Sequence, residues 1–189
     1  VLAPNIRYFV RNHVKGLFEE GATSPYGRLE FAEMRSWVLA KLMWEPELDT
    51  HALVEDFMCG YYGAAAPYVL AYFDLIHQVL RDRPDAHFGI FLPPRVLFLG
   101  DNEMANAREL FDRAERAADS PEVLERVRVA RLSIRYWDLL RLPPDSPVRD
   151  EEIAAFRTDL ESRGMYQISE WYLLDFSFDK LRQGLTYKF

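Results

Sequence analysis

The chain has 189 residues, with 30 acidic against 23 basic side chains and a formal net charge of −7. Apolar residues make up 49% of it and charged residues 28%, a globular composition that excludes a disordered, collagen-like or coiled-coil chain. A chain of this length buries roughly 70% of the surface that its unfolded state exposes, so we expect one domain, with room for a short attached piece of another. The acidic balance argues against nucleic acid and anionic membranes as partners, because phosphate binding depends on clustered Lys and Arg.

The cysteine content and the apolar runs limit the chain further. Cys59 is the single cysteine, so an internal disulfide and a Cys-based zinc cluster are excluded. The longest uncharged run, residues 57–73, is interrupted by two glycines and Pro67 and is too broken to span a membrane. Residues 1–4 include neither an initiator Met nor a signal-peptide pattern, which leaves open a processed or excised piece.

Helical spacing of apolar residues dominates the sequence, taken in chain order. Residues 4–12 predict a short helix, and the apolar run at 14–18, bounded by turn-forming residues, predicts a buried strand. Residues 29–44 repeat their apolar positions at helical spacing until Pro46 stops the pattern. The same repeat, with Pro, Gly or a capping side chain near its ends, predicts the remaining helices at 49–63, 67–80, 104–118, 120–137 and 146–164.

Two segments do not fit this pattern. Residues 81–101 carry three prolines and predict a loop, and residues 165–189 fit a helix and a strand, so both alternatives remain open there. Acid–base pairs four residues apart mark solvated helix faces at Glu109–Arg113, Asp112–Arg116 and Glu122–Arg126. The sequence therefore predicts a mainly α fold, a bundle-like helical domain preceded by one short strand and a helix.

The motifs of several enzyme classes are missing from the sequence. It contains neither a glycine-rich phosphate loop nor a Gly-x-Ser-x-Gly elbow. Its four histidines lack metal-ligand spacing, and no Glu is followed three residues later by His, so we expect no metal, no cofactor and no carboxylate-bridged centre. Cys59 follows Met58 on a helix that we expect to be buried, which favours a core residue over a nucleophile.

The segment after the predicted strand carries the most unusual chemistry. Glu19 and Glu20 follow the apolar run directly and would stand at the rim of a sheet or barrel, where ligands bind in parallel α/β folds. Sugar hydroxyls donate well to carboxylates, and Phe18 or Trp44 would offer a ring face to a sugar. The alternative is that both acids are solvated turn residues.

A resemblance to a known family gives this segment a context. The string Phe-Ala-Glu-Met-Arg-Ser-Trp-Val-Leu-Ala-Lys-Leu-Met-Trp-Glu-Pro at 31–46 is followed in order by Gly-Tyr-Tyr-Gly at 60–63 and Ala-Ala-Pro-Tyr at 65–68. These strings resemble a family of uncharacterised bacterial glycosidase-like proteins, catalogued as a domain of unknown function and found in multidomain carbohydrate-active proteins. Its members are similar in layout to β-hexosaminidases and α-glucuronidases, with a small α/β domain, a (β/α)₈ barrel and then helices. The resemblance covers residues 4–80, and residues 81–189 resemble a generic helical tail.

This resemblance implies a division of the chain and a set of site residues. Residues 1–46 would correspond to the terminal strand and helix of the barrel, and residues 47–189 to a helical C-terminal domain. Hexosaminidases are similar in having an aromatic–acid pair at a late strand end, which implies Phe18 and Glu19 as substrate-binding residues, with Trp44 shaping the pocket. The Tyr pair of the Gly-Tyr-Tyr-Gly string we interpret as sealing a helix junction.

The mechanism of glycoside hydrolysis limits what this chain can do alone. It needs two carboxyl groups across the scissile bond, about 5–5.5 Å apart for retention or 6.5–9.5 Å for inversion. Glu19 and Glu20, adjacent on a strand, would point to opposite faces and could not form that pair. Glu20 and Glu45 also stand where the family often has Gln and Asn, so fine specificity does not carry over. We therefore expect the chain alone to be inactive.

Two functions remain as hypotheses. In the first, the chain is the C-terminal portion of a glycoside-hydrolase-like protein, with an upstream barrel region of the same polypeptide and a carbohydrate as its partners. The resemblance then implies an exported protein, periplasmic or extracellular. In the second, the chain is a non-catalytic helical module that binds another protein through exposed aromatic residues.

Overall fold

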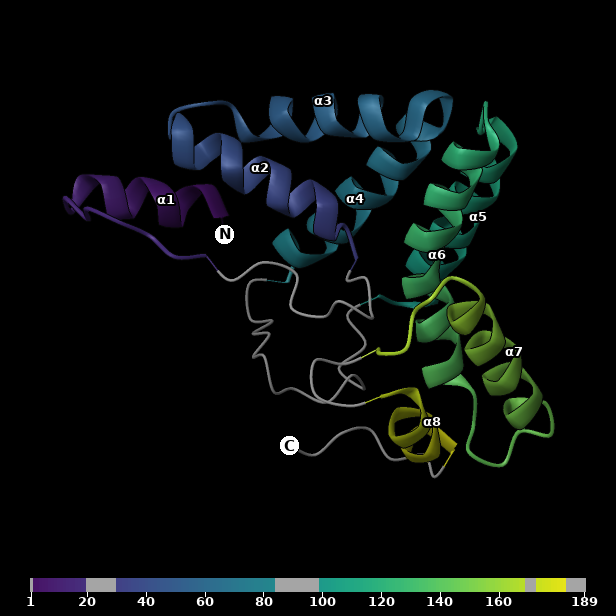
Figure 1. The fold of residues 1–189 in the computed structure, drawn as a ribbon. Coiled ribbons are helices and arrows are strands. Elements are labelled where there is room, and N and C mark those ends of the chain that lie inside the picture. Colours follow the sequence, from purple (N-terminus) through teal and green to yellow (C-terminus); the bar gives the residue numbers. More distant parts are fainter. Residues whose placement is uncertain (1, 20–29, 84–98, 169–172, 183–189) are drawn as a thin grey trace.

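The computed structural model describes residues 2–19, 30–83, 99–168 and 173–182. Helices occupy most of these residues (Figure 1), which confirms the prediction of a mainly α fold. In chain order they are α1 (Leu2–Arg11), α2 (Ala32–Trp44), α3 (Thr50–Tyr62), the 3₁₀ turn η1 (Gly63–Ala65), α4 (Ala66–Arg81), α5 (Asp101–Ala117), α6 (Pro121–Arg141), α7 (Arg149–Ser162) and α8 (Leu174–Arg182). Within the described ranges, extended pairing is limited to an isolated bridge between Gln167 and Leu173.

The prediction of a buried strand at 14–18 is wrong. Residues 14–19 follow α1 without regular secondary structure. Val14 and Phe18 are exposed, and Lys15 and Gly16 interrupt the apolar run between them. A strand is stable where its side chains pack on a pleated surface, and this segment offers too few buried side chains for that.

The structure describes only parts of two segments, the predicted loop at 81–101 and the region 165–189, for which helix and strand were both left open. Residues 99 and 100 lead directly into α5, and residues 84–98 of the predicted loop lie outside the described residues. In the undecided region 165–189, α8 is a helix. Residues 169–172 and 183–189, including the remaining positions of the alternating pattern, lie outside the described residues.

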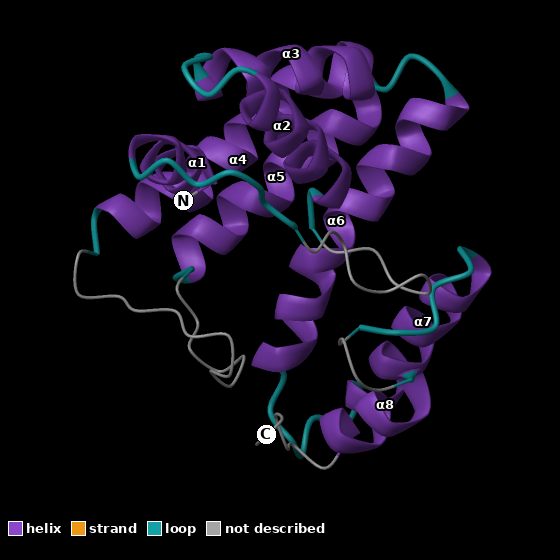
Figure 2. Cartoon of the chain, turned by 60° about the vertical axis from the view of Figure 1, so that its left-hand side comes forward, coloured by secondary structure: helices purple, strands orange, loops and turns teal. Residues whose placement is uncertain are grey.

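The first six helices enclose the larger of two cores. Figures 1 and 2 show α2, α3 and α4 stacked together, with α5 and α6 side by side next to them. Each helix contributes apolar residues three or four positions apart, as the sequence pattern predicts. The fully or nearly fully buried members include Ile6, Leu42, Met58, Val69, Tyr72, Met104, Phe111, Val127 and Ile134.

A second, smaller core lies between α6, α7 and α8. Figure 1 shows α7 beside the C-terminal half of α6, with α8 below it. The buried members are Leu132 and Leu139 from α6, Ile153, Phe156 and Leu160 from α7, Met165, and Leu174, Phe178 and Leu181 from α8. Because Leu132 belongs to this core and Ile134 to the first, α6 is shared by both.

A half-buried carboxylate holds the start of α2 against two other helices. Glu30 accepts hydrogen bonds from the Tyr72 hydroxyl on α4 at 2.6 Å and from the Ser133 hydroxyl on α6 at 2.8 Å. Burial, together with the Glu30 charge, raises the pKa of Tyr72, so the phenol remains a donor. Phe31, next in the chain, takes a left-handed conformation at φ 53° and packs its ring near those of Tyr72 and Phe73. Three helices thus meet at one side chain.

Arg149, the first residue of α7, joins the helices around the second core by hydrogen bonds. Its guanidinium is buried and donates to the Leu142 carbonyl that ends α6, and to the Leu181 carbonyl of α8 at 2.8 Å. The carbonyl groups at a helix C-terminus lack partners within the helix and carry partial negative charge. One buried cation therefore satisfies the ends of two helices.

Replacing this cation tests its role. Arg149→Met keeps most of the volume but leaves the two helix ends without donors, so we expect a loss of about 2–4 kcal/mol in the free energy of unfolding, measured by urea denaturation. Arg182→Met is the matched control, because Arg182 makes long surface ion pairs at 3.9 and 3.5 Å with Asp150 and Asp179. It should change stability by about 0.5 kcal/mol or less. Equal losses in the two variants would contradict the role assigned to Arg149.

Candidate functional site

The three predicted sugar-contact residues all lie on the surface. Phe18 is 92% exposed and Trp44 is 91% exposed, and Glu19 is exposed as well. Phe18 and Glu19 belong to the irregular segment after α1, and Trp44 is the last residue of α2. Figure 1 shows the segment after α1 turning back along that helix. Among the described residues, Glu19 has no hydrogen bond or ion pair, and no ring contact joins Phe18 to Trp44.

Further apolar side chains are exposed on the same elements. Tyr8 and Val10 on α1, Val14 after it, and Met43 on α2 are all about half exposed. We call these four residues, together with Phe18 and Trp44, the N-terminal surface. Single exposed apolar side chains are ordinary, but several of them on two helices that pack together make these elements a candidate interaction site. The N-terminal surface is therefore the first candidate for function.

Arg7 fixes α1 against the loop that follows Trp44. Its Nε donates to the Pro46 carbonyl at 2.9 Å, and its Nη2 donates to the Leu48 carbonyl at 3.0 Å. This contact joins α1 to the loop that follows α2, so Tyr8 and Trp44 lie on helices that pack against each other. The sequence does not indicate the role of Arg7, because its acceptors are main-chain carbonyls some forty residues away, and residue spacing does not reveal such contacts.

Asp49 closes the same loop by capping α3. Its Oδ1 accepts hydrogen bonds from the backbone N–H groups of His51 at 2.8 Å and Ala52 at 3.1 Å. The bonds from Ala52 and then His51 favour the ionised form, so they hold the pKa of Asp49 below its ordinary value. Residues 45–49 are thereby fixed at both ends, which sets the position of Trp44.

The Tyr61–Tyr62 pair seals a helix junction, as interpreted from the sequence. Tyr62 is buried at the end of α3, and burial raises its pKa. The Tyr61 ring stacks on Phe57 with centroids 4.9 Å apart, and the Arg126 guanidinium lies 4.3 Å above it.

The prediction that Cys59 is a core residue is wrong, because Cys59 is exposed. It follows the buried Met58 by one residue, about 100° further around the helix.

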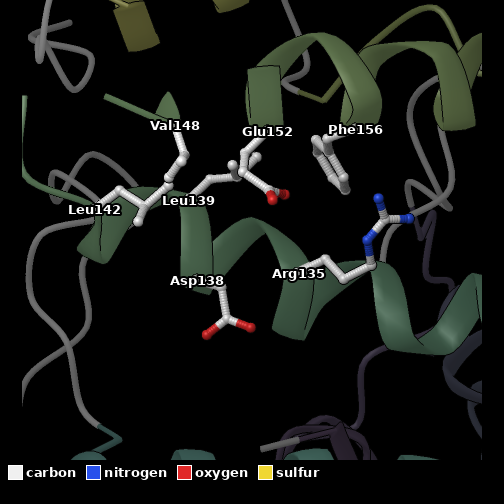
Figure 3. A pocket seen from close by; sticks show the side chains of 7 residues that line it. All are labelled: Arg135, Asp138, Leu139, Leu142, Val148, Glu152 and Phe156. Atoms are coloured by element: carbon white, nitrogen blue, oxygen red, sulfur yellow. The ribbon is translucent and has the colours of Figure 1, made fainter. Parts of the chain in front are cut away.

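A cleft between α6 and α7 offers a second candidate. It has a volume of about 300 Å³ and is lined by Arg135, Asp138, Leu139, Leu142, Val148, Glu152 and Phe156. In Figure 3, Glu152 extends into the space between the two helices, whereas Asp138 points away from α7. Asp138 is engaged by both Nε and Nη2 of Arg108 on α5. The two carboxylates therefore do not face each other as an acid–base pair.

The described residues contain neither a metal centre nor a membrane span. No group of three His, Cys, Asp or Glu side chains within those residues is arranged to hold a metal ion. No helix in the same part of the chain combines the length and apolar character needed to cross a bilayer.

Comparison with known proteins gives one match. Residues 1–74 match the family model of a domain of unknown function, DUF4838. The match runs from α1 into α4 and includes the N-terminal surface. No curated protein and no solved structure matches the chain. The resemblance of this segment to a domain-of-unknown-function family is thus confirmed, and residues 75–189 lie outside the match.

The cap at Asp49 gives a pH-dependent prediction for the loop that positions Trp44. Because the folded pKa lies below the ordinary value of 3.8, the charge stabilises the fold above that value, and this contribution is lost as the pH falls through the folded pKa. Asp49→Ala should therefore be less stable than wild type at neutral pH, with a difference that shrinks at about pH 2.5 in urea denaturation.

Asp49→Asn is the matched control. Asn keeps the capping oxygen but does not titrate, so the stability difference between Asp49→Asn and Asp49→Ala should be the same at both pH values. A wild-type advantage over Asp49→Ala that persists unchanged in acid would contradict the assigned charge effect.

Proposed function

We propose that this chain is the C-terminal portion of a glycoside-hydrolase-like, carbohydrate-active protein. In this proposal its helices support a barrel contributed by an upstream region of the same polypeptide. Phe18, Glu19 and Trp44 contribute contacts to a bound sugar. The observation that carries the proposal is the nearly complete exposure of Phe18 and Trp44 within the segment that matches the domain of unknown function.

The chemistry of these side chains supports a sugar more than a metal or a nucleotide. A sugar ring presents an apolar face and a rim of hydroxyl groups. Phe18 and Trp44 supply aromatic faces, and Glu19, one residue after Phe18, supplies an exposed carboxylate that can accept hydrogen bonds from hydroxyl groups. Binding would cover two large rings that otherwise remain in water.

The supporting role rests on how firmly the elements below this surface are packed. Ile6 on α1 and Val38 and Leu42 on α2 are each 2% exposed or less. Arg7 adds a direct connection between the two helices. A surface carried by a closed core keeps its shape without a partner, which is what a buttress for another domain requires.

The packing of these helices on one another also favours the alternative function, in which the chain acts as a helical module. The N-terminal surface would then bind another protein through its exposed apolar side chains.

A binding experiment separates the two functions. The chain is titrated with a panel of neutral and acidic oligosaccharides and followed by NMR. We expect saturable shifts, with Glu19→Gln weakening the affinity about tenfold because a charge-assisted hydrogen bond is lost. Phe18→Ala and Trp44→Ala should each weaken it about three- to tenfold.

Phe176→Ala is the matched control, because Phe176 is a half-exposed aromatic residue on α8, outside the matched segment. It should bind like wild type. Wild-type affinity in all three site variants would exclude the sugar contacts. Absence of any saccharide response, both for the chain alone and for a polypeptide extended upstream, would favour the protein-binding module.

A further inference from the structure

Four arginines converge on a cleft between α5, α6 and α7, far along the chain from the N-terminal surface. The cleft has a volume of about 520 Å³ and is lined by Glu115, Arg128, Arg131, Arg135, Asp159 and Arg163. This volume falls within the usual range for small-molecule sites, about 300–1,000 Å³. None of the lining residues belongs to the segment that matches the domain of unknown function, so the inference does not depend on the proposed function.

The position of these arginines follows from the packing of α6. Arg128, Arg131 and Arg135 are spaced three and four residues apart, so they form one stripe along the helix. The neighbouring faces of α6 are taken by the two cores, through Val127 on one side and Leu132 on the other. The stripe is the part of α6 that neither core covers, and α7 brings Arg163 up to it from the other side.

Carboxylates on α5 and α7 hold these side chains in place. Arg131 Nη1 lies 2.7 Å from Asp112 and 2.8 Å from Glu115, and Arg135 Nη1 pairs with Asp159. Burial alone would lower the pKa of Arg131, but its hydrogen bonds to Glu115 and Asp112 outweigh this and raise it. The guanidinium groups are therefore charged and fixed before any ligand arrives, which lowers the entropic cost of binding.

Donors remain after these contacts are made. A guanidinium has five N–H groups, and the contacts of Arg128, Arg131 and Arg135 within the described residues use Nε or Nη1. Their Nη2 groups make no hydrogen bond to a described residue. Arg163 pairs through Nε with Glu125 at 2.8 Å and through Nη1 with Asp159. Its side chain is 14% exposed, so water screens the charge weakly.

The N–H donors that remain in the cleft select the class of ligand. Four guanidinium groups and two carboxylates line the cleft, and two further carboxylates, Asp112 and Glu125, pair with Arg131 and Arg163, so the cluster as a whole is neutral. A long polyanion would be repelled by a protein whose net charge is −7, whereas a small anion would accept hydrogen bonds from the remaining donors. A phosphate group carries about −1.5 to −2 charges at neutral pH and tetrahedral oxygens that accept paired N–H donors.

We propose that the cleft between α5, α6 and α7 binds a small ligand through a tetrahedral oxyanion, a phosphate or sulfate group, held by Arg128, Arg131, Arg135 and Arg163. Arg135 also lines the neighbouring cleft of Figure 3, where its guanidinium lies 5.3 Å from the centre of the Phe156 ring. The remainder of the ligand therefore has an apolar wall next to the charged end of the site.

The test uses the full chain and inorganic phosphate at constant ionic strength, followed through the arginine Nε–Hε signals in NMR. We expect saturable shifts in the cleft arginines that equal additions of chloride do not produce. Arg128→Gln should weaken phosphate binding about three- to tenfold. Because Arg128 is half exposed and its ion pair with Glu115 is long, at 3.6 Å, this variant should keep the fold. The thermal unfolding midpoint checks this, and Arg128→Lys should give an intermediate affinity.

Arg157→Gln is the matched control, because Arg157 on α7 is also held by two carboxylates, Glu161 and Asp175, but does not line the cleft. It should bind phosphate like wild type. Glucose 6-phosphate and glucose 6-sulfate then distinguish the two sources of the oxyanion by their relative affinities. Absence of saturable shifts with phosphate and with sulfate, or equal losses in Arg128→Gln and Arg157→Gln, would overturn the proposal and leave the arginines as internal ion-pair partners.

Discussion

The sharing of α6 by two cores is the constraint on which the rest of the structure depends. Val127 and Ile134 face the core formed with α1 to α5, and Leu132 and Leu139 face the core formed with α7 and α8. A helix that buries two faces has a fixed rotation about its axis, because turning it would expose apolar surface on both sides. This rotation also fixes the direction in which α6 presents the three arginines of the cleft, Arg128, Arg131 and Arg135.

The two polar anchors of the fold also connect to α6. Ser133 donates to Glu30 and so ties the start of α2 to the middle of α6. Arg149 donates to the Leu142 carbonyl and so joins the start of α7 to the end of α6. In each case one charged group is hydrogen-bonded to two other helices, so removing it would leave a buried group on one of them, such as the Tyr72 hydroxyl, without this partner. The N-terminal surface and the arginine cleft thus rest on one continuous framework.

Local signals predicted the helices well. Asp49 caps α3, and Ser120 with Pro121 begins α6, as expected from side-chain and proline preferences at helix starts. The apolar repeat in α5 predicted its buried residues, including Met104 and Phe111. These signals act within one or two turns of chain, which is why a single sequence contains them.

Features that depend on partners distant in sequence were not predictable in the same way. The strand expected at 14–18 needed a neighbouring strand, which no local pattern can guarantee. The pair expected between Glu122 and Arg126 forms at 2.5 Å, but Asp112 pairs with Arg131 on α6, not with Arg116 four residues on. Spacing along α5 alone therefore did not predict the charged cleft that α5, α6 and α7 form together. Phe18 and Trp44 are exposed, and their role as site residues remains a prediction that binding experiments can test.

The dependence of the two cores on α6 is tested most directly by hydrogen exchange in two matched variants. Ile134→Val removes one methylene from the first core on α6, and Ile153→Val removes one from the second core on α7; each change costs about 0.5–1.5 kcal/mol. Since the second core packs on a helix that the first core holds, Ile134→Val should speed backbone exchange in α5, α6, α7 and α8. Ile153→Val should speed it in α7 and α8 and leave α5 unchanged. Faster exchange in α5 for Ile153→Val, or unchanged exchange in α7 for Ile134→Val, would contradict this account.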